Sequence, residues 1–186
     1  MEMPVTKMTL GEYMAWEEVQ LEKNEFHRGE VFAMVGARRG HARVLLNLGS
    51  ELSARLKGTP CQVFVDSMKV QIGDDTVLYP DVFVTCERDY SPNDLVCKEP
   101  VLVIEVLSPS TRTYDANKKF TLYRRLASLR EYVLIDPETR DVNVYRRSAA
   151  DEWTLHVMTE RADLVLATVD ATIPFAEIFD GIEPAT

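Results

Sequence analysis

The chain has 186 residues, of which 46% are hydrophobic and 27% are charged. This length and composition correspond to about one folded domain and exclude a disordered or low-complexity chain. No apolar run approaches the roughly 20 residues of a membrane-spanning helix, and the acidic N-terminal stretch lacks the pattern of a secretory signal. We therefore expect a single domain over residues 1–186, located in the cytoplasm and without a membrane partner.

The cysteines give no indication of a stabilising cross-link or a metal. Three are present, Cys61, Cys86 and Cys97, and no two have the C-x-x-C spacing of a zinc or redox motif. The sequence therefore predicts neither a disulfide framework nor a zinc site, and a reducing compartment is the default expectation.

The net charge of −9 is distributed unevenly. Residues 148–186 contain eight acids and one base, whereas residues 38–57 contain five bases and one acid, and residues 112–130 contain six bases and one acid. The acidic total argues against a nucleic-acid partner, and the two basic segments favour one. Because solvated helix faces often have the same composition, the segments alone support a polyanion only modestly.

The N-terminal half is expected to contain two helices. Thr9 and Glu12 have the capping-box spacing at the start of a helix over residues 9–19. His41 leads a stripe of leucines at spacings of three and four, which predicts a second helix over residues 40–57. Strands are expected over residues 25–26, 31–35, 62–65, 69–72 and 81–85, followed by a loop over 91–100.

The second half is expected to supply the centre of a sheet. Residues 101–107, VLVIEVL, form a continuous apolar and β-branched run, which is typical of a strand covered on both faces. A helix is expected from residue 108 to about residue 128, followed by strands over 131–135, 141–146 and 153–158 and by a final segment over 173–179 with a short helix. The predicted fold class is α/β, of the mixed α+β kind. It has a central mixed β-sheet that is flanked by helices.

Two acids stand out on the predicted strands. Glu105 interrupts the apolar run, and a carboxylate there is costly unless it is paired, hydrogen-bonded or bound to a metal. Asp81 follows Pro80 at the start of another strand, where a turn is the simpler explanation. Taken together, two acids on neighbouring buried strands could supply oxygen ligands to a hard divalent cation such as Mg²⁺.

The helix after Glu105 supplies a cation. Lys119 shares the spacing of Leu122, Tyr123 and Leu126, so it lies on the stripe that faces the sheet, whereas Lys118 aligns with polar positions. The alternative to a catalytic role is that Lys119 extends along the core edge and pairs with Glu105 or Asp115.

Two further residues are secondary candidates. His41 heads the leucine stripe of the predicted second helix, although a packed and hydrogen-bonded histidine is the more common situation. Glu30, just after Gly29, could be a third acid or a residue on the surface of a hairpin.

These motifs resemble a known family. Pro80-Asp81, then Glu105 in VIEVLSPST, then Asp115 with Lys119 and Tyr123, and finally EYVLIDP are similar to the Uma-type endonucleases. That family belongs to the PD-(D/E)xK, restriction-endonuclease-like superfamily, and the resemblance runs from about residue 9 to residue 147. One departure concerns the motif lysine, whose position is occupied by Leu107.

The resemblance implies a metal-dependent endonuclease that hydrolyses phosphodiester bonds, with DNA favoured. Asp81, Glu105 and the Val106 carbonyl would hold Mg²⁺, which Mn²⁺ could replace, and Lys119 would take the lysine role in place of Leu107. Glu30, His41 and Asp115 would be secondary, and a homodimer is expected of an enzyme that cuts both strands. Contacts to the phosphate backbone would come from Arg38, Arg39, Arg43, Arg124 and Arg125.

Two other functions stay open. The net charge, the acidic C-terminal segment and Leu107 also fit a catalytically weak or inactive module that binds or assembles through the same fold. A metal-dependent hydrolase of a smaller phosphate ester is the third possibility.

Overall fold

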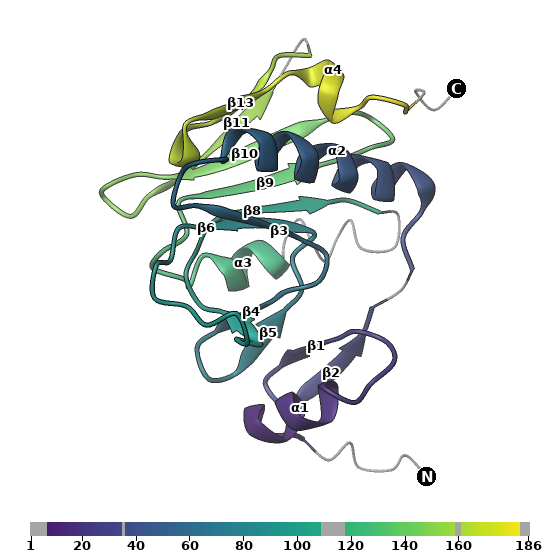
Figure 1. Ribbon diagram of the computed structural model, residues 1–186, viewed down its shortest axis with the longest axis vertical. Helices are drawn as coiled ribbons and strands as arrows, with labels where there is room; N and C mark the ends of the chain where they lie inside the picture. Colours follow the sequence, from purple (N-terminus) through teal and green to yellow (C-terminus); the bar gives the residue numbers. More distant parts are fainter. Residues whose placement is uncertain (1–6, 35, 109–117, 159–160, 183–186) are drawn as a thin grey trace.

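The computed structural model describes residues 7–34, 36–108, 118–158 and 161–182 (Figure 1). Its largest element is a six-stranded sheet. In sheet order, its strands are β11 (Trp153–Met158), β10 (Val142–Arg147), β9 (Glu131–Ile135), β8 (Pro100–Val106), β6 (Val82–Thr85) and β3 (Gln62–Val65). Only the β8–β9 pairing is parallel, so the sheet is mixed, as the sequence predicts.

A five-stranded sheet lies beside the first. Its order is β2 (Glu30–Ala33), β1 (Asn24–His27), β5 (Thr76–Leu78), β4 (Lys69–Ile72) and β7 (Val96–Cys97). The hairpin of β1 and β2 turns at Arg28 and Gly29, both of which have positive φ. Helix α1 (Leu10–Glu17) packs on this sheet through Tyr13, and Thr9 and Glu12 form the predicted capping box at its start.

Strand β8 is the buried centre of the larger sheet. On one face, Leu102, Ile104 and Val106 pack in a cluster that includes the leucine stripe of helix α2 (Arg39–Arg55). On the other face, Val103 and Leu107 pack against helix α3 (Phe120–Tyr123) and the residues that follow it. Because successive side chains of a strand alternate between faces, Glu105 points toward α3. The prediction of a strand covered on both faces is confirmed.

The helix predicted from residue 108 to about residue 128 is shorter in its described part. Helix α3 ends at Tyr123, and residues 124–129 continue in tight turns, in which the amides of Arg125, Leu126 and Leu129 bond carbonyls three residues back. Leu122, Tyr123 and Leu126 are nevertheless buried, so the stripe identified the inward face correctly but not the C-terminal end. Residues 109–117, which include Asp115, lie outside the described residues.

Short strands were the elements that the sequence pattern missed. Strands β5 and β7, the pair β12 (Leu164–Leu166) and β13 (Ala171–Ile173), and the 3₁₀ turn η2 (Ala167–Val169) were not predicted. The expected short final helix is α4 (Phe175–Ile178). Strands of two or three residues are too short to establish an alternating pattern, which explains these omissions.

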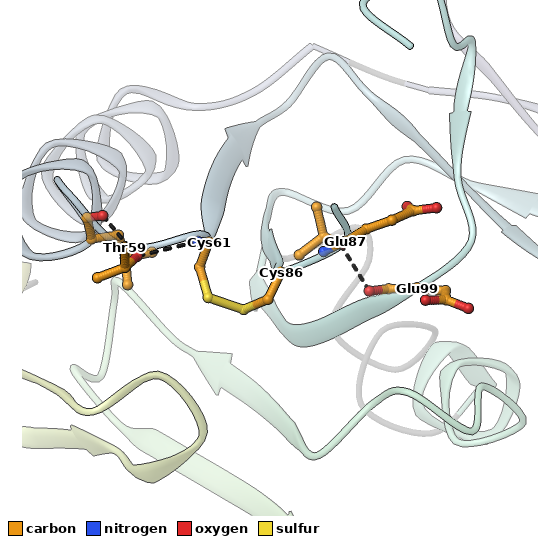
Figure 2. The surroundings of a disulfide bond; sticks show 7 residues. Thr59, Cys61, Cys86, Glu87 and Glu99 are labelled. Carbon is orange, nitrogen blue, oxygen red and sulfur yellow. Dashed lines mark hydrogen bonds between the residues drawn. A yellow bond between two sulfur atoms is a disulfide. The ribbon is translucent and has the colours of Figure 1, made fainter. Parts of the chain in front are cut away.

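The expectation of no disulfide is wrong. Cys61 and Cys86 are bonded to each other (Figure 2). Cys97 is a buried free thiol. Gln62 and Thr85 are directly opposite in the antiparallel pair of β3 and β6, so the two cysteines, one residue further out, also face each other. This pairing depends on the strand register, which cysteine spacing does not reveal.

No helix in the described part of the chain is long and apolar enough to cross a membrane.

Candidate active site

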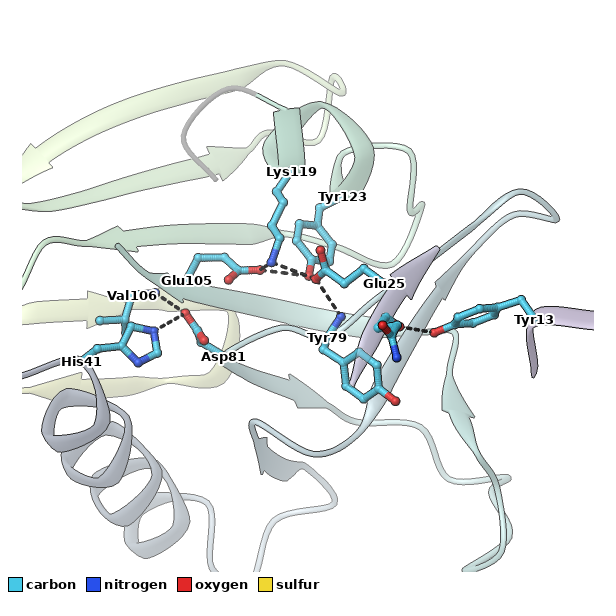
Figure 3. Close-up of polar contacts among 10 residues, drawn as sticks. Tyr13, Glu25, His41, Tyr79, Asp81, Glu105, Val106, Lys119 and Tyr123 are labelled. Carbon is cyan, nitrogen blue, oxygen red and sulfur yellow. Dashed lines mark hydrogen bonds and ion pairs between the residues drawn. The ribbon is translucent and has the colours of Figure 1, made fainter. Parts of the chain in front are cut away.

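Asp81 joins two strands and a helix at the start of β6. Its Oδ2 atom accepts a hydrogen bond of 2.7 Å from the Val106 amide of β8 and lies 3.2 Å from Nε2 of His41 (Figure 3). The carbonyl of Asp81 also accepts a hydrogen bond from the Asp66 amide. The side chain is buried, and His41 reaches it from the first turn of α2. The structure therefore brings the secondary candidate His41 together with Asp81.

Glu105 is buried on β8, with only 1% of its surface exposed. Its Oε1 atom accepts a 3.0 Å hydrogen bond from the Tyr123 hydroxyl and lies 3.4 Å from Nζ of Lys119. The alternative in which Lys119 pairs with Glu105 is thus observed, and it compensates a charge that would otherwise be expensive to bury.

The two adjacent lysines differ as the stripe predicts. The Lys119 side chain is 7% exposed and points inward, where its Nζ lies 2.9 Å from Oε1 of Glu25 in addition to the contact with Glu105. Lys118 is exposed, and its Nζ lies 5.7 Å from the centre of the Phe32 ring. The orientation of Lys119 is confirmed, whereas its role in catalysis stays a prediction.

Glu25 is a residue of this cluster that sequence reasoning missed. It is buried on β1, and its Oε1 atom accepts a 3.1 Å hydrogen bond from the Tyr79 amide. Its neighbour Phe26 faces α1, so Glu25 points away from that helix and toward Lys119. In the sequence, the alternation of Glu25 with Phe26 indicated that the acid lies on the opposite face of the strand from the core phenylalanine. Such a short pattern does not predict which residue the acid contacts.

The electrostatics of the cluster keep one hydroxyl in its neutral form. Burial raises the pKa of Tyr123 well above its ordinary value, and the charges of Glu105 and Glu25 add to the effect. Tyr123 therefore keeps its hydroxyl proton and donates a hydrogen bond to Glu105. Among the described residues, the cluster combines the two carboxyl groups of Glu25 and Glu105 with the single amino group of Lys119.

The remaining predicted residues lie farther out. Glu30 is exposed on the outer strand β2, and among the described residues it has no contact with Asp81 or Glu105. Leu107, at the position of the motif lysine, is packed in the core with α3. Among the predicted phosphate contacts, the arginines Arg38, Arg39 and Arg124 are exposed, and Arg38 lies 3.5 Å from Glu138, while Arg43 pairs with Asp180 and Arg125 with Asp75.

The oxygen atoms of this region fit a hard divalent cation in part. No group of three or more His, Cys, Asp or Glu side chains within the described ranges could hold a metal ion. Asp81 and Glu105, however, meet at the same peptide group. Asp81 accepts a hydrogen bond from the amide of Val106, which is the residue after Glu105. Mg²⁺ typically binds one or two carboxylates and keeps several waters, so Asp81 and Glu105 are the residues here that could contribute ligands to it.

A mixed sheet with buried acids on adjacent strands, and a lysine that approaches from the next helix, defines a restriction-endonuclease-like fold. The chain belongs to the Uma2 family, whose family model, described as "Putative restriction endonuclease", matches residues 10–174. The family and the fold are those of nucleases.

Two relatives and one solved structure agree with this assignment. The uncharacterized proteins slr1290 and sll1609 of Synechocystis sp. (strain ATCC 27184 / PCC 6803 / Kazusa) are 31% and 34% identical to this chain. These matches cover 96% and 84% of the chain and 95% and 91% of the relatives. The crystal structure of a "putative nuclease belonging to DUF820" from Anabaena variabilis ATCC 29413 has a TM-score of 0.75 at 18% identity, covering 92% of this chain and 97% of that one. This last likeness concerns the fold.

Proposed function

We propose that the protein is a divalent-metal-dependent endonuclease that hydrolyses phosphodiester bonds in DNA, with Mg²⁺ as its ion and Mn²⁺ as a substitute. The observation that carries the proposal is that Glu105 is buried against Lys119 while the amide of the next residue, Val106, donates a hydrogen bond to Asp81. A buried carboxylate paired with a lysine beside a second acid is an arrangement that structural packing alone does not require.

Asp81 and Glu105 would hold the ion, with the Val106 carbonyl and water as further ligands. When bound, such an ion polarises the scissile phosphate and makes a coordinated water more acidic. Lys119 would orient the attacking water and offset the negative charge that develops on the phosphate. His41 would orient Asp81 through the 3.2 Å contact with Oδ2, and the neutral Tyr123 hydroxyl would fix one oxygen of Glu105.

The basic segments support a nucleic-acid substrate by their position. Arg38 and Arg39 lie at the start of α2, the same end of the helix that carries His41 toward Asp81. Arg124 directly follows Tyr123, which binds Glu105. Exposed cations thus flank the acids on both faces of the sheet, where backbone phosphates would be neutralised without base recognition. A homodimer would then present two such sites for cutting both strands.

The test is a cleavage assay on supercoiled plasmid, linear duplex, single-stranded DNA and RNA with Mg²⁺, with Mn²⁺ or with a chelator. We expect cleavage of DNA that requires the metal and falls by about a thousandfold or more in Asp81→Asn and Glu105→Gln, because each removes a charged ligand but keeps the side-chain volume. Glu131→Gln is the matched control, since Glu131 is equally buried on β9 but binds Arg146 and the amides of Ala167 and Thr168. Wild-type cleavage rates in either acid variant would contradict the site.

An inactive binding or assembly module is the second candidate, and the burial of Leu107 in the motif position favours it. A thermal-stability titration with Mg²⁺ separates the two. An acid pair that binds the ion raises the melting temperature, and Asp81→Asn or Glu105→Gln abolishes the increase. A module without the ion site shows no increase in any of the three proteins.

The proposed cytoplasmic location can be checked through the cysteines. Disulfides rarely persist in reducing compartments, so a cytoplasmic protein should have reduced Cys61 and Cys86 in the cell. Alkylation of thiols before lysis, followed by mass analysis of the peptides, would detect the label on Cys61 and Cys86 in that case and on neither of them if the bond is present.

A further inference from the structure

Lys119 has an anchor on the smaller sheet that is closer than its partner on the larger one. Its Nζ lies 2.9 Å from Oε1 of Glu25 and 3.4 Å from Oε1 of Glu105. Figure 3 shows the ammonium between the two carboxylates, with Glu25 reaching it from the side opposite to Glu105. The lysine is thus held from two sheets at once, since Glu25 belongs to β1 and Glu105 to β8.

The anchor is itself fixed by the backbone. Oε1 of Glu25 accepts a 3.1 Å hydrogen bond from the Tyr79 amide, two residues before Asp81. A lysine side chain has a flexible four-carbon stem and rotatable donors, so its end is placed only by what it contacts. Lys119 lies at the N-cap of α3 with helical backbone angles, so the helix sets the direction in which the stem leaves the backbone, whereas the two carboxylates fix the position of the ammonium at its end.

We propose that Glu25 is a positioning residue that holds the Lys119 ammonium against Glu105. The catalytic meaning of this assignment rests on the proposed nuclease function, whereas the pairing itself does not. Among the described residues, Glu25 has no contact with Asp81 or Glu105, so it would act through Lys119. The five-stranded sheet therefore contributes to the reaction through one carboxylate.

Glu17 provides the contrast with a purely structural role. It is also a buried glutamate of the N-terminal region, and its oxygens accept from the Asn24 amide, the Asn24 side chain and the Tyr79 hydroxyl. No cation is among these partners. Glu17→Gln is thus the matched control for Glu25→Gln, because each variant removes one buried charge at similar burial and constant volume.

The first arm of the test measures pairing by thermal unfolding of four proteins: wild type, Glu25→Gln, Lys119→Met and the double variant. Removing Lys119 leaves two facing carboxylates without their cation, so the single lysine variant should melt at a lower temperature than wild type. Adding Glu25→Gln to it should then raise the melting temperature by roughly 3 °C or more, since one uncompensated charge is removed. A further decrease of the same size as in the wild-type background would overturn the pairing.

The second arm measures single-turnover cleavage and DNA affinity in the same proteins. Glu25→Gln should slow cleavage about tenfold or more with the Kd for DNA within about twofold, because a misplaced lysine affects the reacting geometry and not binding. In the Lys119→Met background, Glu25→Gln should not reduce the cleavage rate any further. Glu17→Gln should lower the melting temperature and leave the rate unchanged.

The outcomes separate the two proposals. An unchanged rate in Glu25→Gln, or an equal loss in both backgrounds, overturns the positioning role while wild-type cleavage upholds the nuclease. Absence of wild-type cleavage overturns the nuclease and the positioning role together. If Glu25→Gln does not fold, Glu25→Asp replaces it, since it keeps the charge and shortens the reach, and the same loss of rate is expected.

Discussion

Glu105 and Glu17 are both buried glutamates, yet their surroundings differ in kind. Glu17 is bound by neutral donors from Asn24 and Tyr79, all within its own part of the fold. Glu105 is bound by the Tyr123 hydroxyl and by the ammonium of Lys119, which is shared with Glu25 of the other sheet. Neutral hydrogen bonds are sufficient to keep a carboxylate buried.

The comparison teaches how to separate a structural acid from a reactive one. A set of fixed neutral donors stabilises one arrangement and offers nothing to a substrate. A cation on a long side chain, placed between two acids, can be redirected when a metal or a phosphate arrives.

After the two acids, the largest effect is expected for the lysines. Lys119→Met keeps the apolar stem and removes the ammonium, so cleavage should fall about a hundredfold or more, which is the usual scale for a positioned charge in catalysis. Lys118→Met should change little beyond a slight loss of affinity, since Lys118 is exposed. Single-turnover rates on plasmid DNA provide the measurement. Equal losses at both positions would contradict the assignment of Lys119.

A smaller effect is expected when a tyrosine hydroxyl is removed near Glu105 or near Glu17. Tyr123→Phe removes the donor to Glu105, and Tyr13→Phe removes the donor to the Asn24 carbonyl. Each should cost about 1–3 kcal/mol of unfolding free energy, because a buried acceptor loses its partner. Only Tyr123→Phe should also slow cleavage, by about tenfold, since Glu105 loses its fixed orientation. Denaturant unfolding and cleavage rates test both statements, and slower cleavage in Tyr13→Phe would remove the distinction.

The sequence predicted the face of Lys119 and named Glu105 as a possible partner, but it did not predict the closer partner, Glu25. The stripe of Leu122, Tyr123 and Leu126 defines an inward direction, and burial of apolar residues enforces it even though the helix ends early. Glu25 precedes Lys119 by 94 positions, and no local pattern links them. Their contact arises from how the two sheets meet. The same reason applies to Cys61 and Cys86, whose bond follows from strand register.

Tyrosine burial also predicts how stability depends on pH. The pKa of Tyr123 is raised by burial and by Glu105 and Glu25, that of Tyr13 by burial and Glu17, and that of Tyr79 by burial and its bond to Glu17. In the unfolded chain these phenols ionise near pH 10, whereas the folded protein keeps them neutral. Above about pH 10 the unfolding free energy should therefore decrease, by about 1.4 kcal/mol per pH unit for each phenol.

The phenylalanine variants provide the control for this pH dependence. Urea unfolding at increasing pH should show a steeper decrease for wild type than for Tyr123→Phe or Tyr13→Phe, because each variant removes one titrating group. Identical slopes in all three proteins would mean that these hydroxyls ionise as easily in the folded state as in the unfolded one.

The smallest effect is expected at the surface, where the same distinction separates two adjacent arginines. Arg125 is committed to structure, since it pairs with Asp75 at 2.8 Å, whereas Arg124 is exposed beside the residue that binds Glu105. Arg124→Ala should reduce the slope of log K against log salt for DNA binding by about one, with equal effects on unrelated sequences, as one released counterion requires. Arg125→Ala should lower the melting temperature slightly and leave the slope nearly unchanged. A slope that is unchanged in Arg124→Ala would assign this helix end to solvent, and the phosphate contacts would then have to come from Arg38 and Arg39 on the opposite face of the sheet.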